Sequence, residues 1–154
     1  MRTTSMPQYS RLKTCGVQKQ GSDHRLVSGV LEDELYAMQC EIRVNWPELK
    51  IESIKTRMKR FTTDRCLLAQ DFFQNCVGWS INAELDGKIK KEIGRNGCRH
   101  MAILMVDCLH SLVRAELARE LKEALSSNPQ VDKKQLLDDF LKRNPDLKSY
   151  LRIN

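Results

Sequence analysis

The chain has 154 residues, of which 41% are hydrophobic and 30% charged, and its net charge is +6. This composition is typical of one globular domain with terminal extensions. No apolar run approaches the ~18–20 residues needed to cross a bilayer, which argues against a membrane protein. The first twenty residues are polar and basic and lack the apolar segment of a secretory signal, so we expect a cytoplasmic location.

Residues 1–22 are rich in polar residues and show no hydrophobic period, which predicts a disordered basic arm. From Tyr36 to Trp46, apolar and polar residues then alternate strictly. This period of two predicts a strand with one buried face. Shorter segments at 26–31 and 54–58 predict two neighbouring strands, so the first half of the chain should form an antiparallel meander.

The hydrophobic pattern changes to a helical period near residue 63. It predicts helices over 64–77, 85–93, 97–125 and 131–143, the last followed by a polar tail. Strands followed by helices indicate an α+β fold, with an antiparallel β-meander of about three strands and three to four helices packed on one face.

We accordingly divide the chain into three parts. These are a disordered basic arm (1–22), an α+β domain (23–127), and a C-terminal helix and tail (128–154).

The six cysteines differ in their expected roles, and Cys15, which lies in the polar arm, is assigned none. Cys40, Cys76 and Cys108 lie within apolar patterns, and a free cysteine packs as a small hydrophobic side chain, so we expect these three in the core. Cys66 and Cys98 instead stand at the starts of two apolar helices. The free N–H groups and partial positive charge of a helix N-terminus stabilise a thiolate, which attacks electrophiles and binds metals.

A metal site is therefore our leading hypothesis. Cys66 and Cys98 would supply thiolates, His100 an imidazole, and Glu34 from the acidic run 32–34 a carboxylate. Such ligands suit zinc, iron or an iron–sulfur cluster. Two alternatives remain open, namely that these residues only pack in the core, or that a Cys–His pair acts as a nucleophile. No phosphate-binding loop or nucleophile motif is present, so we assign no catalytic residue and favour a function other than catalysis.

Basic residues support a second hypothesis. Lys55, Arg57 and Lys59 should face water on one strand, with Arg43 beside them, and a further basic run spans residues 88–99. Such a face binds nucleic acid or an acidic protein partner. The predicted face carries no exposed aromatic side chain for base stacking.

The stretch from Leu35 to Leu117, with the acidic run that precedes it, resembles a family of bacterial proteins known only as a domain of unknown function. The features that carry this resemblance are a strand preceded by the acidic run Glu32-Asp33-Glu34, a strand that contains Arg and Met, the helix that begins at Cys66 and is followed by Val77-Gly78, and the Gly97-Cys98-Arg99-His100 helix start. The resemblance implies a shared fold and brings no established activity.

The order of elements is also similar to the NifU/IscU-like iron–sulfur scaffold domain, a small sheet followed by helices with three cysteines at one end. Cys66 matches the second scaffold cysteine, and Cys98, with Ala102 four residues later, matches the third. Where that family has its first cysteine, this chain has the acidic run 32–34. The similarity implies an iron–sulfur-related accessory role.

Overall fold

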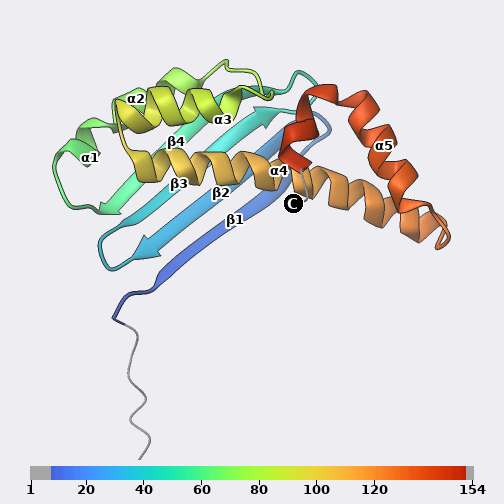
Figure 1. Cartoon of the computed structure of the whole chain (residues 1–154), viewed down its shortest axis with the longest axis horizontal. Helices are drawn as coiled ribbons and strands as arrows, with labels where there is room; N and C mark the ends of the chain where they lie inside the picture. The colour runs from blue at the N-terminus through green and yellow to red at the C-terminus, as the bar shows by residue number, and fades with distance from the viewer. Residues whose placement is uncertain (1–7, 152–154) are drawn as a thin grey trace, which may run out of the picture.

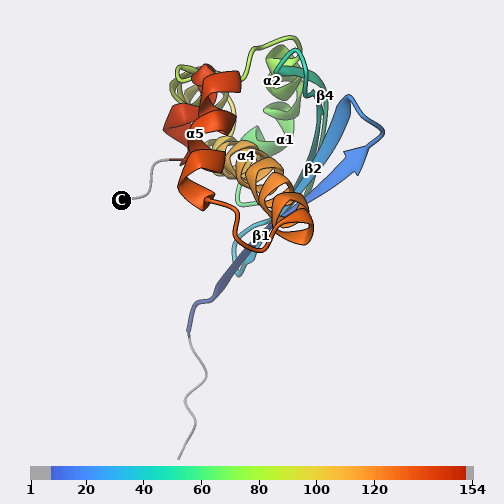
Figure 2. The same cartoon turned by 90° about the vertical axis from the view of Figure 1, so that its right-hand side faces the viewer.

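The computed structural model describes residues 8–151 and has an α+β fold (Figure 1). Four antiparallel strands lie in chain order across one sheet, namely β1 (Arg11–Gln20), β2 (His24–Asp33), β3 (Ala37–Asn45) and β4 (Lys50–Arg60). The helices follow and cover one face of the sheet, as Figure 2 shows from the side. The predicted fold class is confirmed.

Strand β3 has the alternation expected from the sequence. Met38, Cys40, Ile42 and Val44 are buried beneath the helices, while the residues between them lie on the open face of the sheet. Full burial of one such side chain contributes roughly 1.5–3 kcal/mol, so a slip of one residue in register would be costly.

The sheet has one strand more than predicted, because residues 11–20 form β1. The expectation of a disordered arm is wrong for these residues, and residues 1–7 lie outside the described part. β1 is an edge strand in which Cys15 and Val17 pack partly against the core while most other side chains stay exposed. An edge strand that buries so little needs no strict hydrophobic alternation, which is why the pattern was missed.

The first helical segment is more broken than predicted. Three short turns replace the single helix expected over 64–77, namely α1 (Arg65–Leu68), α2 (Gln70–Phe73) and η1 (Gln74–Cys76). α1 buries none of its residues. Without a buried face, a short helix gains too little packing energy to extend.

The later helices are α3 (Leu85–Lys88), the π-helix η2 (Ile89–Arg95), α4 (Arg99–Ser127), α5 (Lys133–Arg143) and the 3₁₀-helix η3 (Pro145–Leu151). α4 is the long helix expected from the sequence, and its apolar residues pack on the inner face of the sheet. Cys40, Cys76 and Cys108 are all buried, as predicted.

The C-terminal segment completes the core. Leu147 and Tyr150 of η3 are buried, and the Tyr150 hydroxyl donates a hydrogen bond to the Asn82 carbonyl at 2.8 Å. The expected polar tail is thus wrong for residues 145–151. Of the helices in the described range, none has the length and apolarity that a membrane crossing requires.

Candidate functional site

The start of α4 lies at the end of the domain where β2 ends and β3 begins (Figure 1), and this start holds Cys98 and His100. Cys98 precedes the first residue of α4, has an extended backbone and is 5% exposed. Cys66, in α1, is half-buried, and its thiol lies close enough to Cys98 to influence the titration of that thiol. The structure therefore brings the two helix-start cysteines together.

The Cys98 thiol is protonated at neutral pH. Burial raises its pKa, and the neighbouring Cys66 thiol acts in the same direction. The backbone N–H groups of Met101 and His100 oppose this rise, as expected at a helix N-terminus, but burial outweighs them. The predicted stabilising groups are present, yet they do not turn Cys98 into a reactive thiolate.

His100 is half-buried and stacks on Tyr36, with 4.0 Å between the ring centroids. Burial lowers the pKa of His100, and Arg11 and Arg99 lower it further against the opposing charge of Asp33. The imidazole is therefore neutral at neutral pH.

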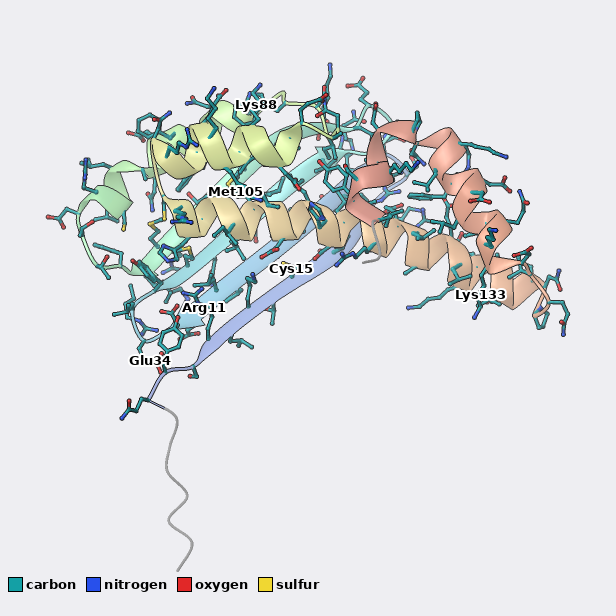
Figure 3. The ribbon with its side chains drawn as sticks, in the orientation of Figure 1. Arg11, Cys15, Glu34, Lys88, Met105 and Lys133 are labelled. Carbon is teal, nitrogen blue, oxygen red and sulfur yellow. The ribbon has the colours of Figure 1, made fainter. Side chains whose placement is uncertain are left out.

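The acidic residues before β3 accept hydrogen bonds from the protein's own backbone. Glu34 accepts hydrogen bonds from the Ser10 N–H at 3.0 and 3.1 Å, beside the start of β1 (Figure 3). The neighbouring Asp33 carboxylate accepts the N–H groups of Leu35 at 2.8 Å and Tyr36 at 2.7 Å. Asp33 thus stabilises the β2–β3 turn, and Glu34 links this turn to the segment that leads into β1.

Asp33 also accepts from the Tyr9 hydroxyl and from Arg11, each at 2.9 Å. Burial would raise the pKa of Asp33, but these donors and the two backbone N–H groups outweigh it and hold the pKa at about 2. Asp33 is therefore ionised over the physiological range and serves a structural purpose.

The predicted ligands do not form a ready metal site. In the stretch from residue 8 to residue 151, no three His, Cys, Asp or Glu side chains are grouped so as to hold a metal ion. Cys66 and Cys98 are neighbours, whereas Glu34 is hydrogen-bonded to Ser10. Metal binding by Cys66, Cys98, His100 and Glu34 remains a prediction.

A second candidate site is a cleft of about 750 Å³ between η2 and the N-terminal half of α4. Its lining residues are Lys90, Gly94, Arg95, Arg99, Ala102, Ile103, Val106 and Asp107. η2 is a π-helix of seven residues, a rare element that is frequent at functional sites. We call this feature the η2–α4 cleft.

The η2–α4 cleft combines a cationic rim with an apolar floor. Lys90, Arg95 and Arg99 are exposed, and no carboxylate within residues 8–151 lies at ion-pair distance from any of them. Asp107, the acidic residue in the lining, is paired with Lys13 of β1 at 2.5 Å. The rim therefore carries uncompensated positive charge, to which the N-terminus of α4 adds.

The open face of the sheet is less basic than the sequence suggested. Lys55, Arg57 and Lys59 are exposed there, as expected. However, Arg43 pairs with Glu52 at 3.4 Å, and Glu41 lies directly opposite Lys55 in the β-ladder. Acidic residues thus offset part of the charge on this face.

The charged residues of the η2–α4 cleft can be recognised in the sequence, but the shape of the cleft cannot. The basic run over 88–99 is visible in the sequence, yet the π-helix that arranges it has no recognisable sequence pattern. Gly94, which lines the cleft beside Ala102, was the available signal, because glycine permits a close approach between helices.

Comparisons with known proteins agree with one part of the predicted resemblance. A family described as "Protein of unknown function (DUF2889)" matches residues 16–114, from β1 into α4. This range contains the four predicted metal ligands and all residues that line the η2–α4 cleft. No curated protein and no solved structure matches the chain, and the similarity to the NifU/IscU-like scaffold finds no support in these comparisons. Because the match spans well over half of its residues, the chain belongs to the DUF2889 family of proteins of unknown function.

Proposed function

We propose that this protein is a binding module for an acidic partner protein, which it holds in the η2–α4 cleft. The observation that carries the proposal is the rim of three cations without carboxylate partners in the described chain. A charged rim around an apolar floor is also how protein interfaces are commonly built, with a polar margin and an apolar centre.

The chemistry of the cleft favours an acidic peptide segment as the ligand. Carboxylates would pair with Lys90, Arg95 and Arg99, and a small apolar side chain would rest on Ile103 and Val106. No aromatic side chain lines the cleft, so it offers no platform on which a nucleic-acid base can stack. Nucleic acid is therefore the less favoured ligand of the two that the sequence suggested.

Binding can be measured with a short fluorescein-labelled peptide of Glu residues with one central Leu. An ion pair at 4 Å in water-like surroundings contributes about 1 kcal/mol. The triple variant Lys90→Gln/Arg95→Gln/Arg99→Gln should therefore weaken binding at least about tenfold at low salt, allowing for screening. Fluorescence anisotropy gives the dissociation constant directly.

The matched control is Lys55→Gln/Arg57→Gln/Lys59→Gln on the open face of the sheet, which removes the same amount of charge. The control should bind the peptide nearly as well as the unaltered protein. Equal losses in both variants would mean that net charge alone attracts the peptide, and the proposal would fail. Tighter binding of a single-stranded oligonucleotide, lost in the same cleft variant, would favour nucleic acid instead.

A second candidate function, metal binding, rests on the closeness of the Cys66 and Cys98 thiols. Two cysteines with His100 suit zinc or iron, and a partner protein would have to complete the coordination. Metal analysis of protein purified without chelators tests this. Stoichiometric zinc or iron that is lost in the double variant Cys66→Ser/Cys98→Ser would support it. A metal-free protein, together with normal folding of the double variant, would contradict it.

A further inference from the structure

Three cysteines, two from the sheet and one from α4, meet where α4 packs on the sheet. In the sheet register, Cys15 of β1 faces Gly29 of β2, and Gly29 faces Cys40 of β3. Cys108 of α4 lies above this row, with its sulfur 3.8 Å from that of Cys15 and 3.6 Å from that of Cys40. Figure 3 shows Cys15 on β1 beside the helix.

Gly29 is what allows Cys108 to sit so close to the sheet. A Cβ atom at this position would lie 2.4 Å from the Cys108 sulfur, which is far inside van der Waals contact. The absent side chain leaves room for the Cys108 sulfur between two neighbouring thiols. The row of three sulfurs is therefore a specific feature of the packing.

The three thiols differ in their access to solvent. Cys40 and Cys108 are buried, whereas Cys15 on the edge strand is half-buried. A dissolved oxidant therefore meets Cys15 first. The hydrogen bond with Cys40 and burial raise the pKa of Cys108, so this thiol is protonated at neutral pH.

We propose that Cys15 and Cys108 are a modification site at which a peroxide forms an intramolecular disulfide. The Cys15 sulfur attacks one peroxide oxygen, the O–O bond breaks, and a sulfenic acid and one water result. The Cys108 sulfur then attacks the Cys15 sulfur, its proton leaves with the hydroxyl group as a second water, and the S–S bond forms. Two thiols lose two electrons in total, and one hydrogen peroxide is reduced to two waters.

The geometry favours this pair. A disulfide bond is about 2.05 Å long, so the two sulfurs must approach by somewhat less than 2 Å. Cys15 lies on an edge strand that is paired on one side only, which can move more easily than the central strands.

The experiment treats the full, reduced protein with hydrogen peroxide, blocks free thiols with N-ethylmaleimide under denaturing conditions, and analyses non-reduced tryptic peptides by mass spectrometry. Cys15, Cys40 and Cys108 fall on separate peptides, 14–19, 26–43 and 100–114. The expected product links peptide 14–19 to peptide 100–114.

Two variants identify the route. Cys15→Ser should remove the link and leave Cys108 free for alkylation, while Cys40→Ser should retain the link between Cys15 and Cys108. Circular dichroism checks that each variant is folded, and Cys15→Ser is expected to fold because its side chain is half-exposed on an edge strand. Recovery of Cys108 as the alkylated thiol while Cys15 is oxidised to the sulfinic acid would overturn the proposal. So would linkage of Cys15 only to a second copy of the chain.

Discussion

Replacement of Gly29 by alanine tests the contact between the sheet and α4 most sharply. The new methyl group would lie 2.4 Å from the Cys108 sulfur and 3.1 and 3.2 Å from two carbon atoms of Leu104. Cys108 and Leu104 are both fully buried, so neither can swing into solvent. The helix or the strand must therefore shift, and overpacking of this kind costs about 1–3 kcal/mol.

One effect offsets part of this cost. Alanine has less conformational freedom than glycine in the unfolded chain, which favours the variant by about 0.5–1 kcal/mol in a strand. The net loss of unfolding free energy is then about 0–2.5 kcal/mol, and it is about 1–3 kcal/mol relative to an alanine that makes the same gain without a clash. For a protein of this size, each kcal/mol lowers the melting temperature by about 2–4 °C, so we expect a melting temperature roughly 2–12 °C below that of such a control.

Urea unfolding of the reduced protein, followed by circular dichroism, measures this loss. Gly16→Ala in β1 is the matched control, because a Cβ atom there has no neighbour within 4 Å. The double variant Gly29→Ala/Cys108→Ala removes the sulfur that the methyl group meets. It should recover about 1 kcal/mol relative to the sum of the single effects, while the Leu104 contact remains.

A Gly29→Ala variant as stable as Gly16→Ala would refute this reasoning, because it would mean that Cys108 does not lie over Gly29. Strict additivity in the double variant would lead to the same conclusion. Either result would also remove the geometric basis of the proposed disulfide.

Three further predictions concern residues that hold the fold together. Asp33→Asn should lower the free energy of unfolding by about 1–3 kcal/mol. Because the pKa of Asp33 is depressed to about 2, the ionised carboxylate stabilises the fold above pH 3.8, and this stabilisation is lost as the pH falls towards 2. Acid-unfolding curves should therefore show a smaller loss of stability over that range for the variant than for the unaltered protein. Arg25→Met should cost about 2–3 kcal/mol in urea unfolding, because it leaves the buried Glu116 carboxylate with the half-buried Arg119, at 2.9 Å, as its remaining ion-pair partner, and a cost below 1 kcal/mol would contradict this. Tyr150→Phe should lower the unfolding free energy by about 0.5–1.5 kcal/mol by removing the hydrogen bond to Asn82, and an unchanged thermal midpoint would show that this bond contributes nothing.

The strands and the long helix could be predicted because each buries one regular face. The alternation in β3 and the apolar stripe of α4 follow directly from residues that must leave water. β1 escaped prediction because an edge strand exposes most of its side chains, and η3 because two residues, Leu147 and Tyr150, provide its burial. Such segments are placed by tertiary contacts rather than by a local period.

The candidate sites could likewise be predicted only in part from the sequence. The closeness of Cys66 and Cys98 could be predicted from their positions at the starts of two helical segments, because α1 and α4 begin at the same end of the domain. The partner of Glu34 could not be predicted, because Ser10 lies in a segment whose sequence predicts disorder. The position of Cys15 beside Cys108 depends on the pairing of β1 with β2, which the sequence pattern did not reveal.

The most direct test of the proposed function is an NMR titration of the ¹⁵N-labelled protein with the Glu-rich peptide that carries a central Leu. Binding in the η2–α4 cleft predicts that the largest amide shifts cluster within residues 89–107 and diminish as salt is added. Shifts concentrated on the open face of the sheet around Lys55 and Arg57, or spread evenly over the basic surface, would contradict the account.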